Sequence, residues 1–234
     1  MDDRDRHAAE APAYNLMKQK MGAKGSATRQ HILDTASRLV DMQTGESPSI
    51  STICREAAIS KATFYQYFED FRTLILELLK PAATDVEVLA GTIATPCPEA
   101  EIFDQFYAFV SAYFTYCTRH RVAFRLRNLA ADAGDEEMIL SRLRAGDAIA
   151  RQLAARVCAA RQGTRERRDD HALAIALMHA MSSAAMFLTR NANPKSVDEV
   201  IAKLYGPPRD YQQRAVAHLM TLALRHPEFP RKQQ

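Results

Sequence analysis

Apolar residues recur at spacings of three and four along almost the whole chain, and nowhere do they alternate with a period of two. Spacing of three and four is typical of an amphipathic helix, whereas alternation is typical of a strand. The first such stretch, at residues 28–42, shows the pattern with Ile32, Leu33, Ala36, Leu39 and Val40. Glycine and proline turn signals separate the successive stretches. The predicted fold class is all-α.

Turn signals and capping residues divide the chain into a series of expected helices. Ser49, Ser60 and Asp70 each stand where a helix N-cap is expected, because their side-chain oxygens can accept a free backbone N–H. Residues 1–27 precede the first helix and are expected to form a flexible basic arm. After the helix at 28–42, the expected helices cover about residues 50–57, 61–67, 71–79, 99–119, 122–131, 136–161, 165–189, 196–205 and 210–225.

A helix, a three-residue turn and a short helix follow one another between residues 50 and 67. This is the helix-turn-helix pattern of DNA-binding proteins, although many helical proteins contain such a corner. With Phe64 as the inward residue and a step of 100° per residue, Ala62 and Gln66 point outward. Thr63 and Tyr65 flank them. No acidic residue occurs from 60 to 68, which favours a surface that meets DNA.

The outward side chains of the short helix suit the chemistry of a DNA groove. Glutamine pairs with adenine, and the methyl groups of alanine and threonine contact the thymine methyl. Lys61, at the start of the helix, suits guanine or a phosphate. The free N–H groups and positive dipole at the same end also favour a phosphate. The short helix is therefore predicted to enter the major groove.

The stretch TRQHILDTASRLV…ISTICREAAISKATFYQYFEDFRTLILELL resembles the DNA-binding domain of the tetracycline-repressor (TetR) family. The resemblance covers about residues 28–79, and its strongest part is residues 59–68. It implies a three-helix helix-turn-helix domain at residues 28–80, followed by a larger helical ligand-binding and dimerisation domain at residues 81–234. The residues then expected to contact DNA are Lys61, Ala62, Thr63, Tyr65, Gln66, Tyr67, Ser60, Ser49, Arg72, Lys24 and Arg29.

Three positions depart from the family pattern. Ala58 stands where the family usually has the glycine of the turn, so the turn is expected to be built with a negative φ, since a positive φ costs an alanine about 1 kcal/mol. Phe71 replaces a lysine that often contacts phosphate, a role we assign to Arg72 instead. Pro48 replaces a threonine, which leaves neighbouring serines such as Ser49 to reach the backbone of DNA.

The resemblance also implies a ligand-responsive regulator, most often a repressor, which binds a palindromic operator as a homodimer and is released by a small-molecule effector. The dimer is expected to form through about residues 166–189 and 209–226. Residues 172–189 support this independently, because a helix that is apolar on nearly all sides must be buried on nearly all sides. The alternative is a central core helix within one subunit.

Aromatic, methionine and histidine residues in two helices are candidates for the effector pocket. Arg125 and Arg127 interrupt an apolar stretch, and they fit either an anionic ligand or a solvated or salt-bridged arginine. Ordinary core packing is an equally open explanation for the aromatic positions. The candidate ligand-binding residues are Phe106, Tyr107, Tyr113, Phe114, Arg125, Met178, His179 and Met186.

Composition and motifs exclude several other classes of protein. The net charge is only +3, and the four cysteines lack the spacing of a zinc site or a disulfide framework. No signal peptide, membrane span, phosphate-binding loop, nucleophile motif or metal motif is found, so we expect a cytoplasmic protein that is not an enzyme and needs no cofactor or metal. The alternative function is an all-helical small-molecule-binding protein or enzyme whose helix-turn-helix is only structural.

Overall fold

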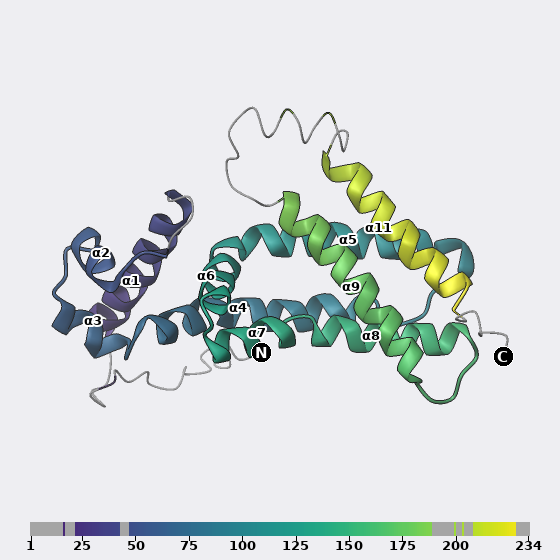
Figure 1. The fold of residues 1–234 in the computed structure, drawn as a ribbon, viewed down its shortest axis with the longest axis horizontal. Helices are drawn as coiled ribbons and strands as arrows, with labels where there is room; N and C mark the ends of the chain where they lie inside the picture. Colours follow the sequence, from purple (N-terminus) through teal and green to yellow (C-terminus); the bar gives the residue numbers. More distant parts are fainter. Residues whose placement is uncertain are drawn as a thin grey trace, which may run out of the picture. The chain divides into compact units, whose positions relative to one another are not determined.

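The computed structural model describes residue 16 and residues 22–42, 47–188, 199, 203 and 208–227. Every regular element in these ranges is helical, which confirms the predicted all-α class (Figure 1). The chain divides into two compact units, Met1–Leu78 and Leu79–Gln234. The helices are α1 (Ala23–Met42), α2 (Ile50–Glu56), α3 (Lys61–Tyr67), α4 (Phe71–Gly91), the 3-10 turn η1 (Glu99–Glu101), α5 (Ile102–Arg119), α6 (Arg121–Asp132), α7 (Glu136–Arg144), α8 (Asp147–Ala160), α9 (Arg168–Leu188) and α11 (Pro208–Arg225).

The first unit packs α1, α2, α3 and the start of α4 around one apolar core. Burial of these side chains removes apolar surface from water and fixes the three-helix arrangement. Ile59, Tyr67 and Phe71 are partly buried and pack against the same core. The core consists of Ile32, Leu33, Ala36, Leu39, Ile53, Cys54, Phe64, Phe68 and Leu74.

Helix α1 begins at Ala23, five residues before the start we expected at residue 28. Residues 23–27 of the expected arm are therefore helical. Alanine and lysine favour a helix enough to offset Gly25 in the first turn. The hydroxyl of Thr28 donates to the carbonyl of Lys24 at 3.0 Å, which fits a regular helical turn there. The rest of the expected arm lies outside the described residues, apart from Leu16 and Gly22.

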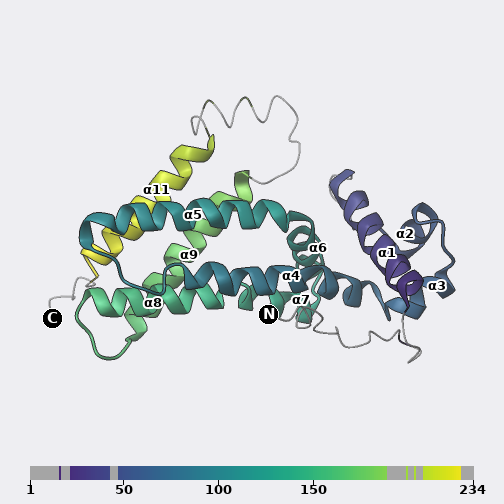
Figure 2. The ribbon, with the colours of Figure 1, turned by 180° about the vertical axis from the view of Figure 1, so that it is seen from behind.

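The second unit is a bundle of long helices. Helix α11 packs on α5 and α9, and α9 packs on α8. Figures 1 and 2, seen from opposite sides, both show α9 and α11 side by side against α5. The core of the second unit includes Phe106, Phe114, Leu126, Leu153 and Met181, which are all buried. None of the helices in the described ranges has the length and apolarity that a membrane span requires.

The end of α4 differs from our prediction. Helix α4 continues through Pro81 instead of ending there. The proline ring removes one backbone donor and costs several kcal/mol, roughly 3. Burial of Ala82, Val86 and Leu89 on the continuing helix outweighs that loss. Tertiary packing therefore decides the length of α4.

The single helix expected at residues 136–161 is divided into α7 and α8 at Gly146. A Cβ at Gly146 would lie 1.9 Å from the sulfur of Met178 in α9. The absence of a side chain at Gly146 leaves room for the end of the Met178 side chain, and a glycine inside a helix also weakens it. The helix expected at residues 196–205 lies outside the described residues except for two positions.

Candidate nucleic-acid interface

Helix α3 is fixed at its start by a polar cap and along its inner face by aromatic rings. The hydroxyl oxygen of Ser60 accepts the N–H of Thr63 at 3.0 Å, which confirms Ser60 as the N-cap. Phe64 is fully buried, as is Phe68 directly after the helix, and their ring centroids lie 5.5 Å apart. A helix of seven residues is unstable alone. The cap and the two rings therefore hold it in a single orientation.

The turn between α2 and α3 contains Ala58 with a φ of 53°, so our expectation of a negative φ is wrong. The physical reason lies in the hydrogen bonds that surround it. The N–H of Ile59 donates to the carbonyl of Cys54 at 3.0 Å, and the N–H of Ala58 donates to Arg55 at 3.2 Å. This pattern requires a left-handed residue after the helix, usually a glycine. The half-buried side chain of Ile59 completes the motif against the core.

The outer face of α3 carries five of the six side chains of this helix that we predicted to contact DNA. Lys61, Ala62 and Tyr65 are exposed, and the exposed fraction of Tyr65 is 49%. Gln66 and Thr63 are half-buried, and the hydroxyl of Thr63 lies 2.9 Å from that of Ser60. No carboxylate stands on the helix. The structure therefore brings these side chains together on one acid-free surface.

Tyr67 and Phe71 lie against the core of the first unit. Both are half-buried and pack on the apolar cluster. The aromatic residue at position 71 thus stabilises the packing of α4, which gives a physical reason for the absence of the lysine common in the family. Arg72 is exposed beside it, and Ser49 caps α2 by accepting the N–H of Thr52 at 3.1 Å. Lys24 is exposed in the first turn of α1.

Arg29 is held inside the first unit. Its guanidinium forms an ion pair with Glu77 of α4, and its Cζ lies 5.1 Å from the centroid of the Phe68 ring. An arginine with these two partners connects α1 to α4. A contact between Arg29 and DNA would require the ion pair to open.

One backbone contact reaches α3 from the segment before α1. The N–H of Leu16 donates to the carbonyl of Gln66 at 3.0 Å. That carbonyl is one of the last in the helix, where no N–H of the helix itself is available. The bond uses only the backbone of Gln66. Its amide side chain is thus not engaged by this contact.

The aromatic residues that we considered for a ligand pocket are placed in the core or in links between helices. Phe106 and Phe114 are buried. The hydroxyl of Tyr107 donates to Asp210 of α11 at 2.5 Å. The hydroxyl of Tyr113 lies 2.8 Å from that of Ser182 in α9. Tyr107 and Tyr113 therefore link α5 to α11 and α9, whereas Phe106 and Phe114 belong to the core.

The other pocket candidates are spread over the second unit. Met178 approaches Gly146, His179 is exposed on α9, and Arg125 is half-buried on α6. The side chain of Met186 lies outside the described part of the structure. Among the described residues, no group of three metal-binding side chains is found.

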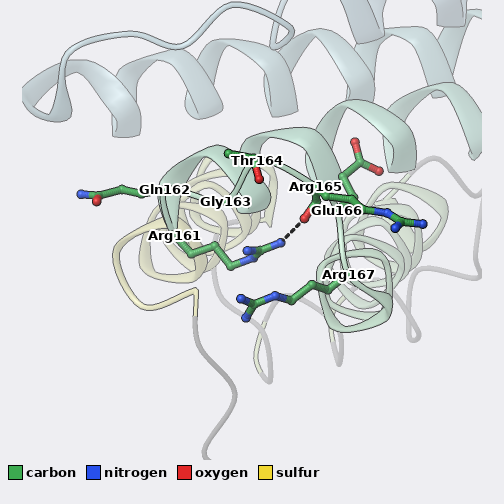
Figure 3. A pocket seen from close by; sticks show the side chains of 7 residues that line it. All are labelled: Arg161, Gln162, Gly163, Thr164, Arg165, Glu166 and Arg167. Atoms are coloured by element: carbon green, nitrogen blue, oxygen red, sulfur yellow. Dashed lines mark hydrogen bonds between the residues drawn. The ribbon is translucent and has the colours of Figure 1, made fainter.

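Two hollows are described, and both lie at the connection between α8 and α9. Their volumes are about 410 and 430 Å³, and Gly163, Thr164, Arg165 and Glu166 line both. Figure 3 shows the side chain of Arg161 pointing to the Arg165 carbonyl, to which it donates at 2.6 Å. None of the seven ligand candidates with a described side chain lines either hollow.

Three arginines in the second unit have buried side chains that the sequence analysis did not single out as buried. They are Arg127, Arg156 and Arg161. Arg127 follows Phe124 by three residues, and Arg156 follows Leu153 by the same spacing. This spacing places each arginine on the inner face of its helix. An arginine at an inward position of an amphipathic helix was therefore the feature of the sequence that could have revealed these buried side chains.

Comparison with solved structures finds a protein of Mesorhizobium loti assigned to the TetR family of transcriptional regulators. The TM-score is 0.52 at 17% sequence identity, and the match covers 86% of this chain and 98% of that chain. The chain has the TetR-family fold. This fold thus extends well beyond residues 28–79, where the sequence resemblance lies. No protein-family model and no curated protein matches the sequence.

Proposed function

We propose that the chain is a DNA-binding transcriptional regulator that inserts α3 into the major groove. The observation that carries this proposal is the acid-free outer face of α3, with Lys61, Ala62 and Tyr65 exposed above a buried Phe64. An ordinary solvent-facing helix surface carries mixed charges, and acids on it would repel phosphate. The TetR-family fold supports the proposal, because it supplies a second helical unit beyond the helix-turn-helix.

We assign the base contacts and the backbone contacts to different side chains. Gln66 and Tyr65 reach base edges, and Ala62 and Thr63 approach the thymine methyl group. Lys61 and the free N–H groups at the start of α3 bind phosphate, with further backbone contacts from the region of Ser49, Arg72 and Lys24. Contacts of Lys61, Ser49, Arg72 and Lys24 with the DNA backbone fix the register of α3 on the DNA and carry little sequence preference.

We further propose that two copies of the chain associate through α9 and α11. The buried side of α9 carries Ala174, Leu177, Met181 and Ala185. Its opposite side exposes mainly small and apolar residues, namely Ala172, Ile175, Ala176, His179, Ala180 and Ser183. Large apolar side chains are also exposed along α11, at Tyr211, Leu219 and Leu222. Two neighbouring helices with exposed apolar faces are typical of a subunit interface.

A homodimer presents two copies of α3 to a palindromic operator. Repression would follow where the operator overlaps a promoter, and a small molecule that prefers one dimer geometry would change the affinity for DNA by its differential binding. We place this effector site in the second unit. The protein would then release its operator when the effector is present.

DNA binding is tested by fluorescence anisotropy with fragments from the region beside the gene that encodes the chain. We expect a specific fragment to bind, with an affinity that falls steeply as the salt concentration rises, because bound phosphates release counterions. An enzyme or carrier with a merely structural helix-turn-helix would show no salt-dependent binding. That result would contradict the proposal.

A pair of glutamine substitutions tests whether α3 is the reading helix. Gln66→Ala should weaken binding to the preferred operator by about 1–3 kcal/mol and relax the preference at one base pair. Gln152→Ala, at a half-buried glutamine of α8, serves as the control and should leave binding unchanged. Equal affinities and equal base preferences for the two variants would show that α3 does not read the operator.

A pair of leucine substitutions tests the proposed dimer. Leu219 on α11 and Leu143 on α7 are exposed to 49% and 69%. Leu219→Arg should convert the dimer to a monomer in sedimentation velocity at micromolar concentration, because it places an unpaired charge in an apolar interface. Leu143→Arg should leave the dimer intact. A wild-type chain that sediments as a monomer would refute this part of the proposal.

A further inference from the structure

Two of the three buried arginines in the second unit are each held by several oxygen atoms. Arg156 donates from Nη1 to the carbonyls of Ile93 and Thr95, both at 3.1 Å, and to Oε1 of Gln105 at 2.7 Å. Arg161 is paired with buried Asp170 at 2.6 Å. A buried guanidinium keeps its charge, so such partners are what its burial requires. Both arginines therefore have evident structural roles.

Arg127 of α6 lacks comparable partners. Its side chain is only 8% exposed. Its Nε and one terminal nitrogen approach a single oxygen, Oδ1 of the adjacent Asn128, both at 3.3 Å. Its Cζ lies 4.9 Å from the centroid of the Phe124 ring. In the described part of the chain, no carboxylate forms an ion pair with Arg127. Its positive charge is thus buried without a negative partner.

The groups around Arg127 supply no negative charge at neutral pH. Burial raises the pKa of the Tyr113 and Tyr116 hydroxyls, and it raises the pKa of the Cys117 thiol to about 11. All three groups are therefore neutral. Burial, together with the like charge of Arg142, lowers the pKa of Arg127 itself. An arginine nevertheless stays protonated in proteins.

Two charged residues of α4 and α7 in the region of Arg127, Asp85 and Arg142, form ion pairs with other residues. Asp85 of α4 lies 2.8 Å from His120 and 3.3 Å from Arg119. Arg142 of α7 is paired with Asp132 at 2.6 Å. Neither pair leaves a carboxylate for Arg127. Arg127 is therefore a buried guanidinium without an anion, in contact with one amide oxygen and one aromatic ring.

We propose that Arg127 binds the carboxylate of a small organic acid whose apolar body packs on the rings of Tyr116 and Phe124. A guanidinium and a carboxylate form two parallel hydrogen bonds, which are strong where water is excluded. One guanidinium matches a singly charged acid, whereas a phosphate carries more charge than this site offers. The inference rests on the proposed function, in that this acid is the effector of the regulator.

A stability comparison tests the inference without knowledge of the effector. A site that holds an unpaired charge for a ligand is strained in the free protein. Arg127→Met should therefore raise the melting temperature of the ligand-free chain, by about 2–4 °C. Arg156→Met removes an arginine that binds three oxygen atoms of other segments, and it should lower the melting temperature. A fall for Arg127→Met as large as that for Arg156→Met would assign Arg127 a structural role and overturn the proposal.

A binding comparison tests the chemical class of the ligand. The probes are benzoate, phenylacetate and hexanoate, each with its neutral amide, and inorganic phosphate. We expect at least one acid to raise the melting temperature of the wild type, its amide to have no effect, and Arg127→Met to bind that acid at least about tenfold more weakly. Arg127→Lys should retain part of the affinity. Stabilisation by phosphate alone, by acid and amide alike, or by none of the probes would overturn the carboxylate assignment.

These measurements use no DNA, so they are independent of the proposed function. If the acids bind through Arg127 while the wild type fails to bind DNA in the anisotropy experiment, the carboxylate site is supported and the regulator assignment is refuted. If the wild type binds DNA but the acids do not bind, the regulator assignment is supported and the carboxylate site is refuted. The final step is to add the acid to the wild-type complex with DNA, where release of the operator would identify it as an effector.

Discussion

The two units hold their helices in different ways. In the first unit, α2, α3 and α4 each begin with a side chain that accepts the N–H three residues further on. These caps are Ser49, Ser60 and Asp70, at distances of 3.1, 3.0 and 2.7 Å. Helices α2 and α3 contain only seven residues each. Short helices nucleate poorly, so caps matter most there.

In the second unit, α5, α6 and α8 begin without a side-chain cap, although Asp135 caps α7. Buried arginines instead fix the connections between the helices. Arg156 reaches the carbonyl of Ile93, 63 residues away in the sequence. Arg161 holds Asp170 and the carbonyl of Arg165. The starts of the helices in the first unit thus depend on caps within a single helix, whereas the second unit depends on buried arginines that join one segment to the next.

The largest expected effect comes from breaking the buried pair of Arg161 and Asp170. Asp170→Ala leaves the guanidinium buried without its anion, which should lower the free energy of unfolding by about 3–5 kcal/mol. The loss should appear as faster hydrogen exchange in α8 and α9. Asp169→Ala, at the exposed neighbouring acid, is the control and should change the stability by less than about 0.5 kcal/mol.

The double variant Arg161→Met with Asp170→Leu separates a lost ion pair from an unpaired charge. Replacement of both partners by apolar residues should recover most of the stability, since no buried charge is left alone. If Asp170→Ala alone has no measurable effect, the buried pair does not organise the connection between α8 and α9.

Acid should weaken the second unit through the same aspartate. The hydrogen bonds from Arg161 and the N–H of Arg167 hold the pKa of Asp170 below its ordinary value. Because the folded-state pKa is lower than the unfolded-state pKa, the stabilisation is complete above about pH 4 and is lost as the pH falls below it. Urea denaturation between pH 6 and pH 3 should show this slope. Asp170→Asn should reduce the slope, and an unchanged slope would assign the acid sensitivity to other groups.

A smaller effect is expected from the caps of the first unit. Asp70→Ala removes the acceptor for the N–H and hydroxyl of Thr73, so it should lower the stability by about 1 kcal/mol. Glu69→Ala changes an adjacent exposed acid that caps nothing. Equal stability of the two variants in urea denaturation would show that the cap at the start of α4 is not needed.

The local contacts of the first unit were predictable from the sequence, and the distant contacts of the second were not. Ser49, Ser60 and Asp70 were predicted as caps because a cap acts within three residues. Burial of Phe64 and exposure of Ala62 followed from helical geometry alone, whereas Gln66, also predicted to point outward, is half-buried. The fold class and the orientation of α3 were therefore accessible before the structure.

The missed features all depend on residues far away in the sequence. The break at Gly146 lies where the Met178 side chain of another helix packs, and the passage of α4 through Pro81 reflects burial on a continuing apolar face. Similarly, Arg125 was preferred to Arg127 as a ligand contact. The two differ only in which side of α6 faces the bundle, which periodicity over a short stretch does not fix.

The smallest effect, and the only expected gain in the first unit, concerns the turn before α3. Ala58 has a φ of 53°, a conformation that costs an L-residue about 1–2 kcal/mol and costs glycine almost nothing. Ala58→Gly should therefore raise the free energy of unfolding by up to about 1 kcal/mol, after the greater freedom of glycine in the unfolded chain is included. Ala27→Gly, in the exposed first half of α1, is the matched control and should lower it by about 0.5–1 kcal/mol. Opposite signs in urea denaturation would show that the left-handed turn strains the alanine. A loss of stability in both variants would mean that the methyl group of Ala58 contributes more than the strain removes.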